Sequence, residues 1–320
     1  MKRSATARPD WPTLVLVVFC YAAWAWATTW AWALSPPLAL VVATLAVTLF
    51  SSIQHEVLHG HPFASRFWNE VLVFPALPLL YPYGRFRDTH LQHHQDENLT
   101  DPYDDPESNF WDPAVWVTLP RWVQGLLRFN NTLMGRLLVG PALGTLVFWW
   151  GDLRAMRAGD RAILRDWALH AAGVALVLSW LALVAQMPVW AYLLAVYAGH
   201  SVLKIRTFLE HRAHEKARGR TVIIEDRGPL ALLFLNNNLH VVHHTHPQVA
   251  WYELPRLYAA RKSHYLGKNE GYRYASYGEV FRRYFFRAKD PVPHPLMQQA
   301  ARAPEPPPAP PMPPIRHAAE

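Results

Sequence analysis

The chain has 320 residues, of which 51% are hydrophobic and 15 are tryptophan, and its formal net charge is +7. The length allows one or two domains, but this composition is typical of a protein in contact with lipid rather than of a soluble one. The single cysteine, Cys20, excludes a disulfide framework and any CxxC metal site, and no nucleic-acid-binding motif accompanies the basic charge.

Two long segments carry no charged side chain, one between Asp10 and Glu56 and the other between Asp166 and Lys204. Because a helix needs about 20 apolar residues to cross a bilayer, each segment has room for two spans and a short turn. We therefore predict an all-α integral membrane protein whose four transmembrane helices form two hairpins, over residues 11–34, 38–54, 167–185 and 189–206.

The basic residues predict the orientation of these spans. Neither hairpin turn carries a charge, whereas Lys2, Arg3 and Arg8 precede the first span and further arginines follow each hairpin. By the positive-inside rule, both termini and the segment between the hairpins are cytoplasmic. These Lys and Arg residues suit contacts with anionic lipid headgroups, and the alternative is that they dock an acidic redox protein or an acidic substrate carrier.

Histidines recur in four short motifs near the predicted cytoplasmic ends of the spans: HEVLH at residues 55–59, HLQHH at 90–94, an EH pair ending at His211, and HVVHH at 240–244. Spacings of three and four residues place side chains on one face of a helix, so each HxxHH motif is predicted to present three imidazoles together. Nine histidines exceed what one zinc site uses, and they suit two metal ions in a histidine-rich cytoplasmic cap. The predicted metal ligands are His55, His59, His90, His93, His94, His211, His240, His243 and His244.

The segments between these motifs are predicted to lie at the membrane surface. Residues 71–83 are apolar but short and are interrupted by three prolines, and residues 137–150 would separate the motifs across the bilayer if they spanned it. Six carboxylates from Asp96 to Glu107 form a loop that we interpret as solvated or as hydrogen-bonded to arginine and histidine. The alternative is that these carboxylates orient metal-bound imidazoles.

The ends of the chain are predicted to lie outside the folded domain. Residues 1–10 form a short basic lead, and residues 11–290 form the membrane domain. Residues 291–320 contain 11 prolines and are predicted to be a disordered or polyproline tail.

Histidines outside the motifs need separate interpretations. His200 lies 11 residues before His211, which is about 1100° of helical rotation, so it shares the His211 face about 16 Å deeper in the membrane. We predict that His200 lines a passage for the substrate, with an interhelical hydrogen bond as the alternative. His170 is interpreted as a helix-to-helix hydrogen-bonding group and His294 as a surface residue.

The HEVLH, HLQHH and HVVHH motifs, the EH pair and the two predicted hairpins resemble the membrane fatty acid desaturase superfamily, which includes acyl desaturases, alkane hydroxylases, and carotenoid hydroxylases and ketolases. The similarity covers roughly residues 43–265. The segments FLNNNLHVVHHTHPQVAWYELPRLY and DENLTDPYDDPES most resemble bacterial members, including those acting on amino-acid-derived metabolites such as dihydrorhizobitoxine, so a bacterial inner membrane is expected. Where some members have an Asn one turn before the histidine that ends the fourth span, this chain has Thr207.

The resemblance implies a cofactor, a reaction and partners. It implies two iron ions bound by the histidines, O2 as the oxidant, and desaturation of a fatty-acyl or related aliphatic substrate. It also implies two external electrons. Because the chain has no haem-binding, flavin or rubredoxin-like segment, we expect a separate donor such as a ferredoxin or rubredoxin with its reductase.

Three other functions stay open at this point. The same scaffold is used by hydroxylases and ketolases of alkanes or carotenoids. HEVLH also fits the HExxH motif of an intramembrane zinc metalloprotease, in which Glu56 would be the general base, but that function leaves the HxxHH motifs unexplained. A metal transporter would carry its polar residues near mid-membrane, whereas these histidines lie at the ends of the predicted spans.

Overall fold

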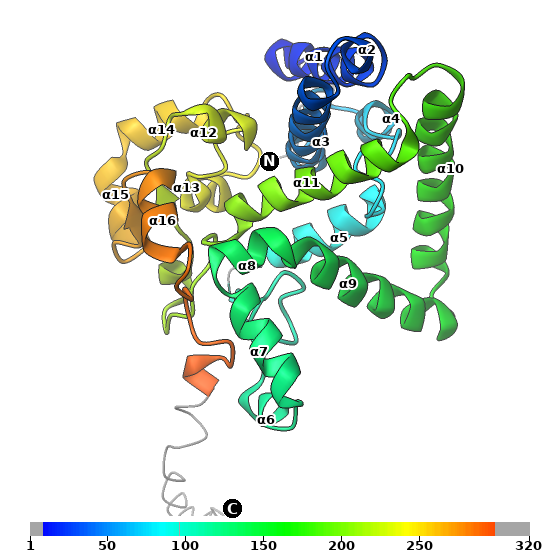
Figure 1. Cartoon of the computed structure of the whole chain (residues 1–320). Helices are drawn as coiled ribbons and strands as arrows, with labels where there is room; N and C mark the ends of the chain where they lie inside the picture. The colour runs from blue at the N-terminus through cyan, green and yellow to red at the C-terminus, as the bar shows by residue number, and fades with distance from the viewer. Residues whose placement is uncertain (1–8, 96, 298–320) are drawn as a thin grey trace, which may run out of the picture.

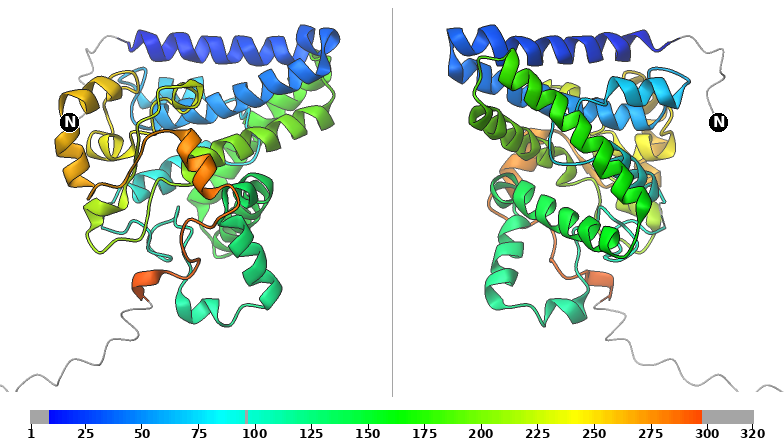
Figure 2. Two further views of the ribbon diagram at one scale, coloured as in Figure 1. Left: turned by 60° about the vertical axis from the view of Figure 1, so that its left-hand side comes forward. Right: turned by 90° about the vertical axis from the view of Figure 1, so that its right-hand side faces the viewer.

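The computed structural model describes residues 9–95 and 97–297, which are mostly helical. The first apolar segment forms α1 (Trp11–Trp26), a π-helical turn η1 (Ala27–Ala31) and α2 (Trp32–Leu34) in one continuous rod, followed after Ser35 by α3 (Pro36–Leu58). The Asp10 carboxylate caps α1 by accepting a hydrogen bond from Thr13 N, at 3.3 Å. Pro36 occupies the first turn of α3, where its missing N–H costs nothing. The α1 rod and α3 lie side by side (Figure 2).

The second apolar segment forms α10 (Arg161–Leu183) and α11 (Val189–Thr207). Among the described residues, three helices are long and apolar enough to cross a membrane, namely residues 11–34, α3 and α10. The 19-residue α11, predicted as the fourth span, falls short because His200, Lys204 and Arg206 lower its hydropathy. Helix α3 contains the predicted span over residues 38–54 and continues through the HEVL sequence to Leu58.

A hydrogen-bonded contact joins the two apolar segments. Within the π-helical turn η1, the Thr28 carbonyl accepts hydrogen bonds from the backbone N–H groups of Gln186 and Met187, both at 2.9 Å. The Thr28 hydroxyl accepts another from Trp180 Nε1, at 3.0 Å. The turn between α10 and α11 is therefore held against the α1 rod.

Close backbone approach joins α3 to α11. A Cβ atom added at Gly199 would lie 2.8 Å from Val47 Cγ1, and the Gly199 carbonyl accepts a hydrogen bond from Thr48 Oγ1 at 3.1 Å. Small residues permit this kind of contact between membrane helices. The contact holds α3, which contains His55 near its end, against α11, which leads to His211.

The predicted surface segments have different structures. Residues 73–82 are irregular, as their prolines predict, and lie between α4 (Arg66–Leu72) and α5 (Tyr83–His93). Residues 137–150 begin within α8 (Leu133–Leu138) and continue into α9 (Gly140–Arg157). Helix α9 extends beyond the apolar run to include Asp152, whose carboxylate pairs with Arg85 at 2.9 Å.

The other described elements are short. The helices α12 to α16 gather together at one side of the chain (Figure 1). The strand β1 pairs in parallel with β2, with Ile223 opposite Arg273. These elements are α6 (Pro113–Trp116), α7 (Arg121–Asn130), the 3-10 turn η2 (Ala217–Arg220), β1 (Ile223–Ile224), α12 (Pro229–Leu233), α13 (His240–Thr245), α14 (Leu254–Ala260), α15 (Lys262–Lys268), β2 (Arg273–Tyr274) and α16 (Tyr277–Tyr284).

Packed structure continues beyond residue 290. Trp111 N donates to the Val292 carbonyl at 2.9 Å, and His294 N donates to the Trp111 carbonyl at 2.8 Å. His294 is only 6% exposed and its ring lies against Phe110, so the surface interpretation of His294 is wrong. Its partners lie far away in the sequence, which is why no local pattern revealed its burial. Residues 1–8 of the predicted lead and 298–320 of the predicted tail lie outside the described residues.

Candidate metal centre

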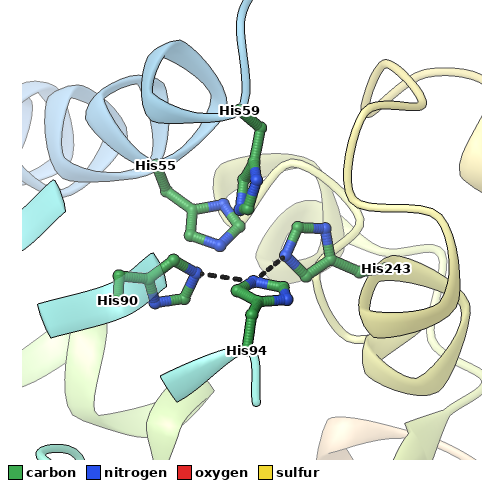
Figure 3. A group of neighbouring side chains, drawn as sticks. All are labelled: His55, His59, His90, His94 and His243. Atoms are coloured by element: carbon green, nitrogen blue, oxygen red, sulfur yellow. Dashed lines mark hydrogen bonds between the residues drawn. The ribbon is translucent and has the colours of Figure 1, made fainter. Parts of the chain in front are cut away.

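All nine histidines of the motifs converge in two adjoining groups. In each group, every residue offers one ligand atom, and these atoms lie within 4.8 Å of one another. The rings of His94 and His244, from different groups, are stacked with their centroids 4.3 Å apart. The five-histidine group consists of His55, His59, His90, His94 and His243 (Figure 3), and the four-histidine group of His93, His211, His240 and His244.

Each HxxHH motif divides its histidines between the two groups, contrary to the prediction that its three imidazoles face one ion together. On a helix, the side chain four residues after a given residue is rotated by about 40° from it. The side chain three residues after it is rotated by about 60° in the opposite direction. At the end of α5, His90 and the capping residue His94 therefore face the five-histidine group and His93 faces the other. In α13, His240 and His244 face the four-histidine group and His243 the other.

The distances between imidazole nitrogens fit ligands of a common ion. In the five-histidine group, His94 Nε2 lies 3.0 Å from His90 Nε2 and 3.2 Å from His243 Nε2. In the four-histidine group, His211 Nε2 lies 2.9 Å from His93 Nε2 and 3.2 Å from His240 Nε2. A metal–nitrogen distance of about 2.1 Å separates two ligands at a right angle by about 3.0 Å.

Two further nitrogens in the five-histidine group point to a ligand. His55 Nε2 and His59 Nε2 are buried and have no hydrogen-bond partner among the described residues. A buried nitrogen without a partner is costly, and a bound cation would satisfy its lone pair. These two side chains project from the end of α3 toward His90, His94 and His243 (Figure 3). The residues present therefore fit a metal ion in this group.

The second ring nitrogen, Nδ1, of three imidazoles is hydrogen-bonded to a carboxylate or an amide oxygen. His93 Nδ1 donates to Asp105 Oδ1 and His90 Nδ1 to Glu107 Oε1, both at 2.8 Å. His240 Nδ1 lies 3.1 Å from Asn237 Oδ1. A donating Nδ1 leaves Nε2 as the free lone pair, and such partners orient metal-ligating histidines. Two carboxylates of the acidic loop therefore orient imidazoles, but its composition alone did not identify Asp105 and Glu107.

Burial keeps most of these imidazoles neutral. It lowers the pKa of His59, His94, His211, His240 and His243, and the neighbouring imidazoles lower these pKa values further. His93 is the exception: burial alone would lower its pKa, but the charges of Glu107 and Asp105 outweigh burial and raise the pKa to about 9. A metal ligand must be unprotonated, so metal binding would displace a proton from His93.

A small polar cavity of about 50 Å³ lies beside the four-histidine group, and its walls include His93, His211 and Thr207. The Thr207 hydroxyl is buried and has no hydrogen-bond partner among the described residues. A cavity of this size has room for at least one water, which needs about 10–15 Å³. The residue that departs from the family pattern therefore faces a space where a water can approach the four-histidine group.

Glu56 of the HEVLH motif lies outside both histidine groups. Its Oε1 accepts a hydrogen bond from Trp251 N at 3.0 Å and lies 3.8 Å from His61 Nε2. His61 Nδ1 in turn lies 2.8 Å from Asp10 Oδ2. A metalloprotease needs this glutamate to face a metal-bound water. Here its carboxylate instead joins the start of α1 and the segment before α14.

His200 does not lie in either group. Its Nε2 forms a 3.0 Å hydrogen bond with the Pro78 carbonyl, and His170 Nε2 forms a 2.9 Å hydrogen bond with the Leu79 carbonyl. Both histidines therefore hold the irregular segment before α5. A cavity of about 310 Å³ lies among α3, α4, α5 and α10, with Gln54, Phe74 and His170 in its walls. His170, interpreted from the sequence as a helix-to-helix hydrogen-bonding group, instead bonds to the irregular segment and lines this cavity. His200 is not among the lining residues.

Comparison with known proteins identifies the family. A search of curated proteins found no match for the chain. The family model of fatty acid desaturases, which are oxidoreductases, matches residues 29–277, from the first apolar rod to the start of α16. This range contains all nine histidines of the two groups. The chain therefore belongs to the fatty acid desaturase family.

Proposed function

We propose that the chain is an O2-dependent diiron oxidase of the membrane that desaturates a fatty-acyl or related aliphatic substrate. The convergence of nine imidazoles in two adjoining groups is the observation that carries this proposal. Neutral imidazoles suit iron, and two irons would supply the oxidising power that an unactivated C–H bond requires. One iron would be held by the five-histidine group and the other by the four-histidine group.

Desaturation fixes the number of electrons required. Two hydrogen atoms leave adjacent carbons of the substrate, two electrons come from a donor protein, and two protons come from solvent, so that one O2 becomes two waters. We propose that a separate ferredoxin or rubredoxin, with its reductase, supplies these electrons. Within this chain, Asp105, Glu107 and Asn237 orient the imidazoles.

The proposed arrangement in the membrane has four spans in two hairpins, with α11 as the fourth span despite its lower hydropathy. Both termini and the histidine groups are cytoplasmic in this arrangement, and the turns near Ser35 and Met187 lie on the other side. A bacterial inner membrane is the proposed location. The cytoplasmic orientation of the termini and the histidine groups is supported by the basic residues that flank the apolar segments. In this proposal, residues 11–290 form most of the membrane domain.

The cavity beside α3 is a candidate place for the substrate. Its walls combine the apolar side chains of Val73, Phe74 and Leu169 with Gln54, which directly precedes His55. His200 stays a second candidate for the passage. The variants His170→Leu and His200→Leu, compared at equal iron content, test which histidine acts. If turnover or substrate preference changes in only one variant, the substrate passage runs past the histidine that was replaced in that variant.

Mass spectrometry of lipids and small metabolites tests the proposed reaction. Cells expressing the protein should contain a product two mass units lighter than its precursor, and cells expressing His243→Ala should lack it. His264→Ala, a substitution of an exposed histidine, is the matched control and should retain the product. A product sixteen units heavier would instead indicate hydroxylation. If the cells contained cleaved peptides but neither the lighter nor the heavier product, that result would contradict an oxidase.

A further inference from the structure

A polar recess of about 320 Å³ lies behind the four-histidine group, between β2, α16 and the segment after α11. Its walls include the cations Arg212, Arg273, Arg283 and Lys289, and its single lining carboxylate is Asp290. The side chain of Arg273 is 43% exposed and that of Arg283 is 53% exposed. The recess is therefore strongly basic and open to a partner.

The cations that line the recess differ in how far carboxylates neutralise them, and Lys289 Nζ lies 3.4 Å from Asp290 Oδ2. The Arg212 guanidinium donates to the Gly219 carbonyl at 3.0 Å, and no carboxylate pairs with it in the described part of the chain. Arg283 reaches Glu279 only at 3.7 Å. Arg282 and Arg287 are exposed beside the recess and form no ion pair with a described carboxylate. Arg273, by contrast, is paired with Glu225. The positive potential therefore centres on Arg212 and the end of α16.

Aromatic side chains accompany this charge. The Arg212 guanidinium lies 4.4 Å from the centre of the Tyr272 ring, and the hydroxyls of Tyr274 and Tyr284 are 2.8 Å apart. Phe286, just after α16, is 76% exposed. Arginine and aromatic residues are enriched at protein–protein interfaces and among the residues that contribute most to binding. This composition favours a protein partner over a small anion.

The recess is connected directly to the four-histidine group. Arg212 follows His211 in the chain, and Lys289 Nζ donates to the His211 carbonyl. Lys289 also lines the small cavity that contains His93 and His211. Tyr272 donates its hydroxyl to the Leu209 carbonyl at 2.8 Å, two residues before His211. The side chains that line the recess therefore contact the backbone of the segment that carries the candidate metal ligand His211.

We propose that this recess is the docking site of the electron donor, an acidic one-electron iron–sulfur protein. This inference rests on the proposed function, because only an oxidase needs such a partner. Each docked donor loses one electron, so two dockings deliver the two electrons that each turnover consumes. Complementary charge accelerates association and disappears as salt rises, whereas uncharged contacts do not. The basic recess therefore sets both the affinity and the salt dependence of electron delivery.

Binding of an acidic [2Fe–2S] ferredoxin to the detergent-solubilised full chain tests this proposal. In low salt, Arg283→Glu should weaken binding by about tenfold, and Arg212→Gln should weaken it with a flatter salt dependence. Arg256→Glu is the matched control, because its side chain on α14 is 86% exposed and lies outside the recess. Equal affinity of wild type and Arg283→Glu, or no binding by wild type, overturns the proposal.

Two further measurements separate this proposal from the proposed function and from lipid binding. Reduction of the bound iron by dithionite bypasses the donor, so Arg283→Glu should be reduced as fast as wild type, and its iron content should be unchanged. A protein without iron would contradict the diiron oxidase, while ferredoxin binding would still report on the recess. If Arg283→Glu loses binding to phosphatidylglycerol vesicles but not to ferredoxin, the recess binds lipid headgroups and the docking proposal is wrong.

Discussion

At the scale of single residues, carboxylates fix the orientation of the imidazoles that are the candidate metal ligands. Asp105 is 5% exposed and accepts hydrogen bonds from both His93 Nδ1 and Thr100 N. Asp105 therefore fixes the orientation of the His93 ring, and its bond to Thr100 N closes the loop in which Asp105 lies. An amide at this position would keep the size but lose the charge that favours the donating Nδ1.

We expect Asp105→Asn to weaken iron binding by about 10- to 100-fold, since loss of a partner that orients a ligand has this effect. The measurement is iron retained by the purified protein against a chelator of graded strength. Asp104→Asn, which changes an exposed carboxylate in the same loop, should retain iron like wild type. Equal retention in both variants would mean that Asp105 does not orient the centre.

At the scale of elements, one glutamate joins the short elements that surround α13. Glu225 follows β1, and its carboxylate bonds to Lys262 of α15, Tyr258 of α14 and Arg273 of β2. Burial alone would raise the pKa of Glu225, but these bonds outweigh burial and lower the pKa to about 2. The charged form is therefore the one that stabilises the fold.

This shift predicts a pH dependence. A carboxylate with a depressed pKa contributes stability above its unfolded value of about 4.5, and this contribution is lost as the pH falls toward 2. Glu225→Gln should therefore cost about 2 kcal/mol near pH 7, measured by thermal unfolding in detergent. The difference from wild type should shrink below pH 4.5. Glu253→Gln, which removes an exposed carboxylate from the neighbouring turn, should have little effect at any pH.

The α3–α11 contact makes a second prediction at this scale. Gly199→Leu would force a side chain against the stiff Val47 and should destabilise the protein by about 1–3 kcal/mol. It should also reduce iron content, because α3 carries His55 and His59 while α11 leads to His211. Gly151→Leu in α9 is the control, since nothing lies within 4 Å of its added Cβ atom. Intact iron binding in Gly199→Leu would separate the helix contact from the metal centre.

At the scale of the whole molecule, the histidine groups require their motifs to share one side of the membrane. Tags placed at the exposed residues Asp104 and Arg227 and at the C-terminus should therefore all be cytoplasmic. Cysteines introduced near Pro36 and Met187 should react with an impermeant reagent from the opposite side. Labelling of the tags at Asp104 and Arg227 from opposite sides would mean that α9 spans the membrane.

Some of this architecture follows from the sequence and some does not. Uncharged runs and histidine spacing predict the long helices and all nine converging imidazoles, because helical periodicity and burial act locally. The division of each HxxHH motif between two groups depends on how α5 and α13 are rotated, which packing sets. The roles of Asp105, Glu107 and His294 depend on loops that meet residues distant in the sequence, so no local pattern reveals them.

The metal content of the purified protein tests the central claim most directly. Elemental analysis combined with Mössbauer spectroscopy should find about two irons per chain in a magnetically coupled pair. His243→Ala and His93→Ala should each lose iron, and His264→Ala should not. One zinc per chain and no iron, or full iron content in His243→Ala and His93→Ala, would contradict a diiron centre held by these two histidine groups.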